Sequence, residues 1–141
     1  MIENIVFKIP DFDLNTISLQ GKGLKKLLVI CCFDDFSEVE RITLQKMMTA
    51  IKYDFENDIY LLLIEKNAQL SLGLLEIDYT DLLIFGIKPE SLGFQIEYKL
   101  YELLTFEKSR AMILESIREI KAVPSRSKLL WDKLQEMFSI S

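Results

Sequence analysis

The chain has 141 residues, of which 50% are hydrophobic, and its net charge at pH 7 is −5. This length and composition fit one globular domain with a sizeable core, and they exclude a chain that is disordered throughout. The sequence has no histidine, which removes the usual general base near pH 7 and the commonest ligand of transition metals. The acidic balance argues against direct nucleic-acid binding, because phosphate contacts need a basic face.

Residues 1–26 differ from the rest and are interpreted as an N-terminal arm. Their scattered apolar residues are interrupted by Pro10 and several acids, and Gly21 and Gly23 suggest a hinge. The arm either packs on the edge of the domain or is a docking peptide that orders on a partner. No secretory pattern and no membrane span is apparent, so we expect a reduced, cytoplasmic location without a membrane partner.

The stretch LLVICCF at residues 27–33 is too short for a membrane span and predicts a strand buried on both faces. Such strands belong mostly to parallel sheets covered by helices. Ser37 and Glu40 have the spacing of a capping box, which opens a predicted helix that continues to about residue 53. Further strands, the first of them parallel to 27–33, are predicted at residues 59–64 and 81–87.

A hairpin is predicted in the second half of the chain. Residues 95–106 alternate in hydropathy, a polar turn follows at 107–110, and residues 111–114 form a short apolar run. The two strands would add an antiparallel pair to a largely parallel sheet.

Two helices are predicted to complete the domain. Ser116 can cap a short helix over residues 117–122, and Pro124 can open a last helix that ends near residue 138. We therefore expect a single α/β domain over residues 27–141, with a mostly parallel sheet of about five strands and one antiparallel hairpin.

Asp34 and Asp35 are the candidates for a ligand site, because they follow the first predicted strand. Ligand crevices of open α/β sheets form at such carboxyl ends, and paired acids there could hold Mg²⁺ or position a water. The alternative is that the two acids shape a polar turn and favour the start of the following helix. No glycine-rich phosphate loop and no serine or cysteine nucleophile with a histidine partner accompanies them.

Several apolar or sulfur-containing side chains could belong either to the core or to a binding surface. Met47 and Met48 could line a pliable surface or fill gaps in the core. Trp131 could anchor a partner or pack the last helix against the sheet. Cys31 and Cys32 are interpreted as core thiols, because their side chains should point to opposite faces of a strand.

The first strand and its acid pair also resemble response-regulator receiver domains, with residues 82–89 similar to the third strand of that family. Gly86 stands where the family has its phosphoacceptor aspartate, and no lysine-ended fifth strand follows. The resemblance implies at most a degenerate receiver-like module without phosphotransfer.

A second resemblance covers residues 81–138. Three features carry it: the segment LIFGIKPESLG at residues 83–93, the predicted strand pair leading to a short helix, and the last helix with Lys128, Leu130, Trp131 and Leu134 after Pro124. These features are similar to the DNA polymerase III psi subunit family. The resemblance implies a three-layer α/β/α sandwich, related in architecture to uracil-DNA glycosylases but without catalysis. In that family an N-terminal peptide engages the clamp loader, but residues 1–26 do not align with it.

Our first hypothesis is therefore a non-catalytic replication protein that binds clamp-loader subunits or a chi-like subunit by protein–protein contact. It predicts no cofactor, no metal and no direct nucleic-acid contact, with Trp131 as the candidate partner-binding residue. The alternatives are a degenerate receiver-like module or a small ligand- or metal-binding α/β domain that uses Asp34 and Asp35.

Overall fold

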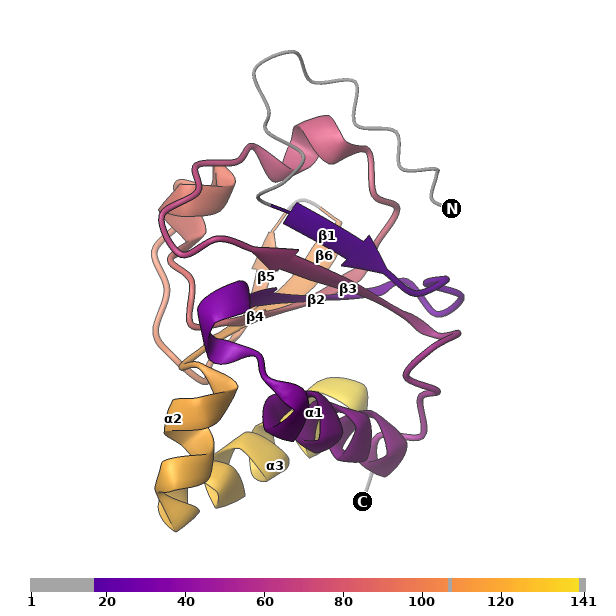
Figure 1. Ribbon diagram of the computed structural model, residues 1–141, viewed down its shortest axis with the longest axis vertical. Coiled ribbons are helices and arrows are strands. Elements are labelled where there is room, and N and C mark those ends of the chain that lie inside the picture. Colours follow the sequence, from indigo (N-terminus) through magenta and orange to yellow (C-terminus); the bar gives the residue numbers. More distant parts are fainter. Residues whose placement is uncertain (1–16, 107, 140–141) are drawn as a thin grey trace.

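The computed structural model describes residues 17–106 and 108–139, which form a mixed α/β fold (Figure 1). A six-stranded sheet with the order β1-β3-β2-β4-β6-β5 lies at its centre. The strands are β1 (Ile17–Gln20), β2 (Leu27–Cys32), β3 (Ile59–Ile64), β4 (Asp81–Phe85), β5 (Leu103–Phe106) and β6 (Ser109–Leu114). The strand predicted over residues 27–33 is thus confirmed up to Cys32, and as β2 it lies between β3 and β4.

The sheet is mixed. Its inner strands β3, β2, β4 and β6 are parallel to one another, whereas β1 and β5 pair antiparallel at the two edges. The antiparallel hairpin β5–β6 was predicted, but β1 was not. It adds residues 17–20 of the predicted arm to the sheet edge, while residues 1–16 lie outside the described part of the chain. The predicted parallel pairing is therefore confirmed only for the inner strands of the sheet.

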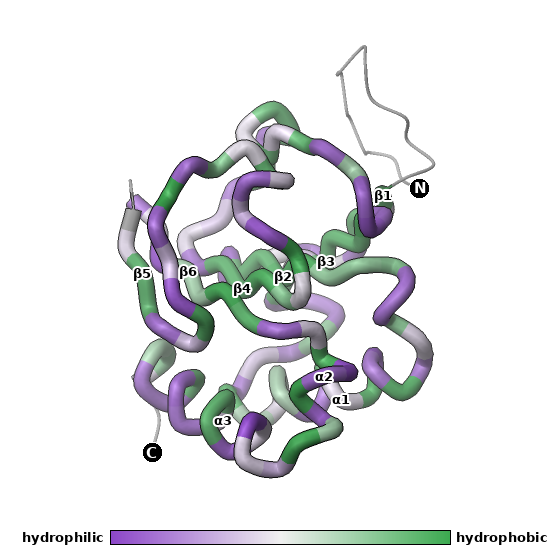
Figure 2. Tube along the Cα trace, turned by 90° about the vertical axis from the view of Figure 1, so that its left-hand side faces the viewer, coloured by the Kyte–Doolittle hydropathy of each residue, from purple (hydrophilic) through white to green (hydrophobic). Residues whose placement is uncertain are grey.

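Three α-helices cover one face of the sheet (Figure 1). They are α1 (Glu38–Ala50), α2 (Ile117–Ala122) and α3 (Pro124–Phe138). Successive side chains of a strand point to opposite faces, so Leu27 and Val29 pack against the helices while Leu28 and Ile30 face the other way. Both sets are fully buried, and Figure 2 shows the inner strands as a hydrophobic band.

The opposite face carries 3₁₀ turns and loops. The turns η4 (Leu72–Leu75) and η5 (Pro89–Leu92) supply the buried side chains of that layer, together with Leu70. Because the buried apolar residues of the α-helices all belong to the first face, the three-layer α/β/α sandwich is not confirmed for the described residues.

Two other predicted strands are also shorter than expected. The strand predicted over residues 95–106 begins only at Leu103, because Tyr101 has a φ of +69° that interrupts an extended chain. The strand predicted over residues 81–87 ends at Phe85, where Gly86 turns with a φ of +72°. No helix within residues 17–106 and 108–139 has the length and apolar character needed to cross a membrane.

Candidate functional site

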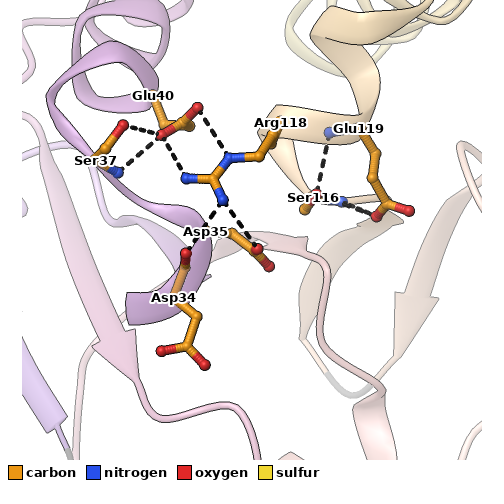
Figure 3. A network of polar contacts seen from close by, with 7 residues as sticks. All are labelled: Asp34, Asp35, Ser37, Glu40, Ser116, Arg118 and Glu119. Carbon is orange, nitrogen blue, oxygen red and sulfur yellow. Dashed lines mark hydrogen bonds and ion pairs between the residues drawn. The ribbon is translucent and has the colours of Figure 1, made fainter.

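The carboxyl ends of the parallel strands bring together the turn after β2 and the start of α2. The turn η3 (Phe33–Asp35) carries the two predicted acids, and α1 begins just beyond it. On the other side, β6 leads through Ser116 into α2, which supplies Arg118 (Figure 3). The close-up shows that residues from these two segments point toward one another.

Arg118 is the centre of this polar network. Its Nε and Nη2 atoms donate to the two carboxylate oxygens of Glu40, at 3.4 and 3.3 Å. Its Nη1 atom donates to the backbone oxygen of Asp34 at 3.4 Å and lies 3.9 Å from a carboxylate oxygen of Asp35. One side chain thereby ties α2 to α1 and to the turn after β2.

Glu40 also completes the capping box of α1 that the sequence predicts. Its Oε1 atom accepts from the backbone N–H of Ser37 at 2.8 Å and from the hydroxyl of Ser37. A second capping box, formed by Ser116 and Glu119, opens α2 beside it. Both helix starts are therefore fixed by side chains next to the network.

The electrostatics of Glu40 favour its ionised form. Burial raises the pKa of this carboxyl, of which 4% is exposed, but the hydrogen bonds from Ser37 and Arg118 outweigh that effect and hold the pKa at about 2. The same pairing raises the pKa of Arg118. Both groups keep their charges at neutral pH, so the network is suited to holding two helices together and not to proton transfer.

The two predicted acids do not converge on a shared point. The carboxylate of Asp35 faces Arg118, whereas that of Asp34 points away from the network (Figure 3). Asp34 lines an open, polar pocket of about 370 Å³ together with Phe33, Glu65, Lys66 and Asn67. Among the residues that the structure describes, no three histidine, cysteine, aspartate or glutamate side chains are placed to hold a metal ion. The geometry thus favours the turn-forming interpretation of the acid pair.

Gly86 leaves no room for a phosphoacceptor. Its backbone N–H donates to the Leu114 oxygen at 2.8 Å, and a Cβ atom on it would lie 2.9 Å from the Cβ atom of Ser116. The antiparallel hairpin at the sheet edge also differs from the all-parallel order of a receiver-type sheet. Both features disfavour the receiver-like alternative.

A second feature lies on the helical face. A mainly apolar groove of about 250 Å³ runs between the three helices. Its apolar lining is contributed by Met47, Ala50, Ile120, Leu130, Trp131 and Leu134, and its polar rim by Thr43, Lys46, Lys121 and Ser127.

The side chain of Trp131 contacts both the core and the groove. One part of its side chain packs against the core cluster under the helices, and the half-buried ring also lines the groove. Met47 lines the groove as well, whereas Met48 is fully buried, so the two neighbouring methionines divide between surface and core. Trp131 thus packs the last helix against the core and also lines the groove, so its position agrees with both interpretations that the sequence leaves open.

An ion pair at the opposite end of the sheet has a structural role. Arg110 donates from Nε to the buried carboxylate of Asp81 at 2.8 Å and from Nη1 to the backbone oxygen of Met137. Its guanidinium lies 5.7 Å from the ring centroid of Phe138. These contacts fasten the end of α3 to β4 and β6.

Sequence reasoning missed Arg118 and Arg110 as organising residues. The capping-box spacing reveals Glu40 as a helix-start residue, but its partner Arg118 is 78 residues away in the chain. No local pattern signals such a pair. The groove was also missed, because only Trp131, Met47 and Met48 were considered as surface candidates and the α2 side chains were not.

No family model, no curated protein and no solved structure matches the chain.

Proposed function

We propose that this protein is a non-catalytic adaptor of DNA replication, similar to the DNA polymerase III psi subunit, that acts in the cytoplasm. In this role it connects the clamp loader to other replication proteins, such as a chi-like subunit, by protein–protein contact. The observation that carries the proposal is the position of Trp131. The tryptophan that the resemblance singles out lines an apolar groove on the surface, where a partner can reach it.

The segments that carry the resemblance also form one structural unit. The turn η5 follows β4, the hairpin β5–β6 pairs with β4, and α2 packs on α3. The buried residues of α3 pack in the same core cluster as residues of β4, β6 and α2, whereas η5 lies on the opposite face of the sheet. This arrangement supports the proposal because it keeps the Trp131 face of α3 in a fixed position.

The ionisable groups and thiols near the carboxyl ends of the strands also support the proposal. A buried Glu40 with a pKa of about 2, paired with Arg118, is charged throughout the neutral range and is shared between two helices. The thiols of Cys31 and Cys32 are buried, and burial raises the pKa of both, so neither is activated as a nucleophile. These groups stabilise a scaffold instead of reacting with a substrate.

Affinity purification tests the proposal. The tagged full-length chain is expressed in the cells it comes from, and its bound proteins are identified by mass spectrometry. We expect a clamp-loader or chi-like subunit to be recovered. Recovery of no replication protein would contradict the adaptor function.

Two variants locate the contact. We expect Trp131→Ala to reduce recovery, and Leu129→Ala is the matched control, because Leu129 is exposed on the same helix and does not line the groove. Equal loss in both variants would point to a general effect on α3 and not to the groove. Normal recovery with Trp131→Ala would place the contact elsewhere.

A further inference from the structure

The groove between the helices has an apolar floor and a basic rim. Lys46 of α1 and Lys121 of α2 lie on its rim. Neither lysine has an ion-pair partner among the described residues. Two positive charges beside an apolar floor are thus available to a ligand.

The two lysines of the rim belong to a helical layer whose net charge is opposite in sign to that of the rest of the chain. The helices α1, α2 and α3 together carry seven lysines and arginines against five aspartates and glutamates, which gives this layer a net charge of +2. The whole chain carries 17 basic against 22 acidic residues, so its net charge is −5 and the part outside the helices has −7. The helical layer is therefore the region of an acidic protein that attracts a negatively charged partner.

The side of α1 that lines the groove also carries an exposed apolar residue beyond the groove itself. Val39 lies one helical turn before Thr43 on the same side of the helix, and its side chain is 54% exposed. A mainly apolar groove that is lined by three helices fits a ligand with apolar side chains at helical spacing. A half-buried tryptophan in its lining is the kind of residue that contributes most to such contacts.

We propose that the groove of α1, α2 and α3 binds an acidic amphipathic helix of a partner protein, with Trp131 contacting its apolar face and Lys46 and Lys121 its carboxylates. This inference rests on the proposed adaptor function and names the chemistry of the partner. A single-stranded nucleic acid is a poorer match, because it needs a continuous basic track and the groove floor is apolar with two lysines at its rim.

The single tryptophan of the sequence reports directly on the groove. The purified full-length chain is titrated with a synthetic amphipathic peptide that has leucines on one face and glutamates on the other, and Trp131 fluorescence is followed. The same peptide with lysines in place of glutamates and a single-stranded oligothymidylate are titrated in parallel. We expect a saturable shift with the acidic peptide, weakened by added salt, and none with the other two ligands.

Charge reversal provides the matched comparison. The double variant Lys46→Glu/Lys121→Glu should bind the acidic peptide about tenfold or more weakly. The control Lys66→Glu/Lys88→Glu makes the same change of charge at exposed lysines outside the helical face and should bind as the wild type does. Circular dichroism of both variants verifies that they are folded.

Three results would overturn the proposal: no fluorescence shift with the acidic peptide, equal binding of the lysine peptide, or a response to the oligonucleotide instead. Affinity purification distinguishes a wrong groove assignment from a wrong adaptor function. Replication proteins recovered equally by the wild type and by Lys46→Glu/Lys121→Glu would refute the groove assignment alone. Peptide binding without recovery of any replication protein would refute the replication role and leave the groove assignment standing.

Discussion

Replacing Glu40 by glutamine tests the role of the network at the strand ends. The substitution keeps the size of the side chain but removes the charge that Arg118 and Ser37 stabilise. The pKa of Glu40 is lowered from 4.5 to about 2, and one pKa unit corresponds to about 1.4 kcal/mol. Because the Arg118 side chain is 52% exposed, water screens part of this interaction, and we expect a loss of about 2–3 kcal/mol near neutral pH.

The pH dependence follows from the direction of the shift. A carboxyl group whose pKa is lower in the folded state stabilises that state fully above its unfolded-state pKa of about 4.5. That contribution is lost as the pH falls through about 2. The difference between wild type and Glu40→Gln should therefore be largest near pH 7 and should fall below about 1 kcal/mol at about pH 2.5.

Urea unfolding followed by far-ultraviolet circular dichroism measures the loss of unfolding free energy near pH 7 and at about pH 2.5. Glu38→Gln is the matched control, because Glu38 is exposed in the same helical turn and should contribute at most about 1 kcal/mol through the helix dipole. A Glu40→Gln variant as stable as the wild type near pH 7, or a deficit that does not change with pH, would refute the reasoning.

Three further predictions concern stability and reactivity. Gly86→Ala should lower the free energy of unfolding by about 1–3 kcal/mol in urea titrations, because φ is +72° and the new Cβ atom would meet Ser116; wild-type stability would contradict this. Arg110→Met should cost about 2–4 kcal/mol in the same assay, because it leaves the buried Asp81 unpaired; a neutral effect would show that Asp81 needs no partner. Both cysteines should resist a thiol reagent until denaturant is added, and native-state labelling would disprove their burial.

The inner strands and the helix starts were predictable because their signals are local. Runs of consecutive apolar residues reveal strands that are covered on both faces, as for β2 and β3. The capping-box spacing at Ser37 and the capping residue Ser116 mark the starts of α1 and α2. In these segments the chemistry of a few neighbouring residues is enough to determine the structure.

The edges of the sheet were less predictable. β1 has one buried and three half-buried residues and exists because its backbone pairs with β3, which its own sequence does not reveal. Residues 95–102 have the alternating hydropathy of a strand, yet Tyr101 adopts a left-handed φ while its hydroxyl donates to Glu115 at 2.6 Å and its N–H donates to Ile113 at 2.9 Å. Tertiary contacts therefore override the local pattern.

The candidate site was predictable only in part, for a similar reason. The strand-end position of Asp34 and Asp35 follows from the order of the elements. The contacts of the Asp35 carboxylate and of the Asp34 backbone oxygen, however, involve Arg118 in a distant helix. Trp131 could be singled out from the sequence because its family resemblance and helical spacing are local features. The groove around it requires the packing of three helices, which no stretch of sequence specifies.

The most direct measurement of the central claim is reconstitution from purified components. The full-length chain is mixed with the clamp loader and the chi-like subunit of its own cells, and the mixture is separated by size-exclusion chromatography. The proposed function predicts that the chain elutes with these proteins in a stable complex. Elution of the chain alone, at concentrations where the other subunits assemble, would contradict the claim that it works as a replication adaptor.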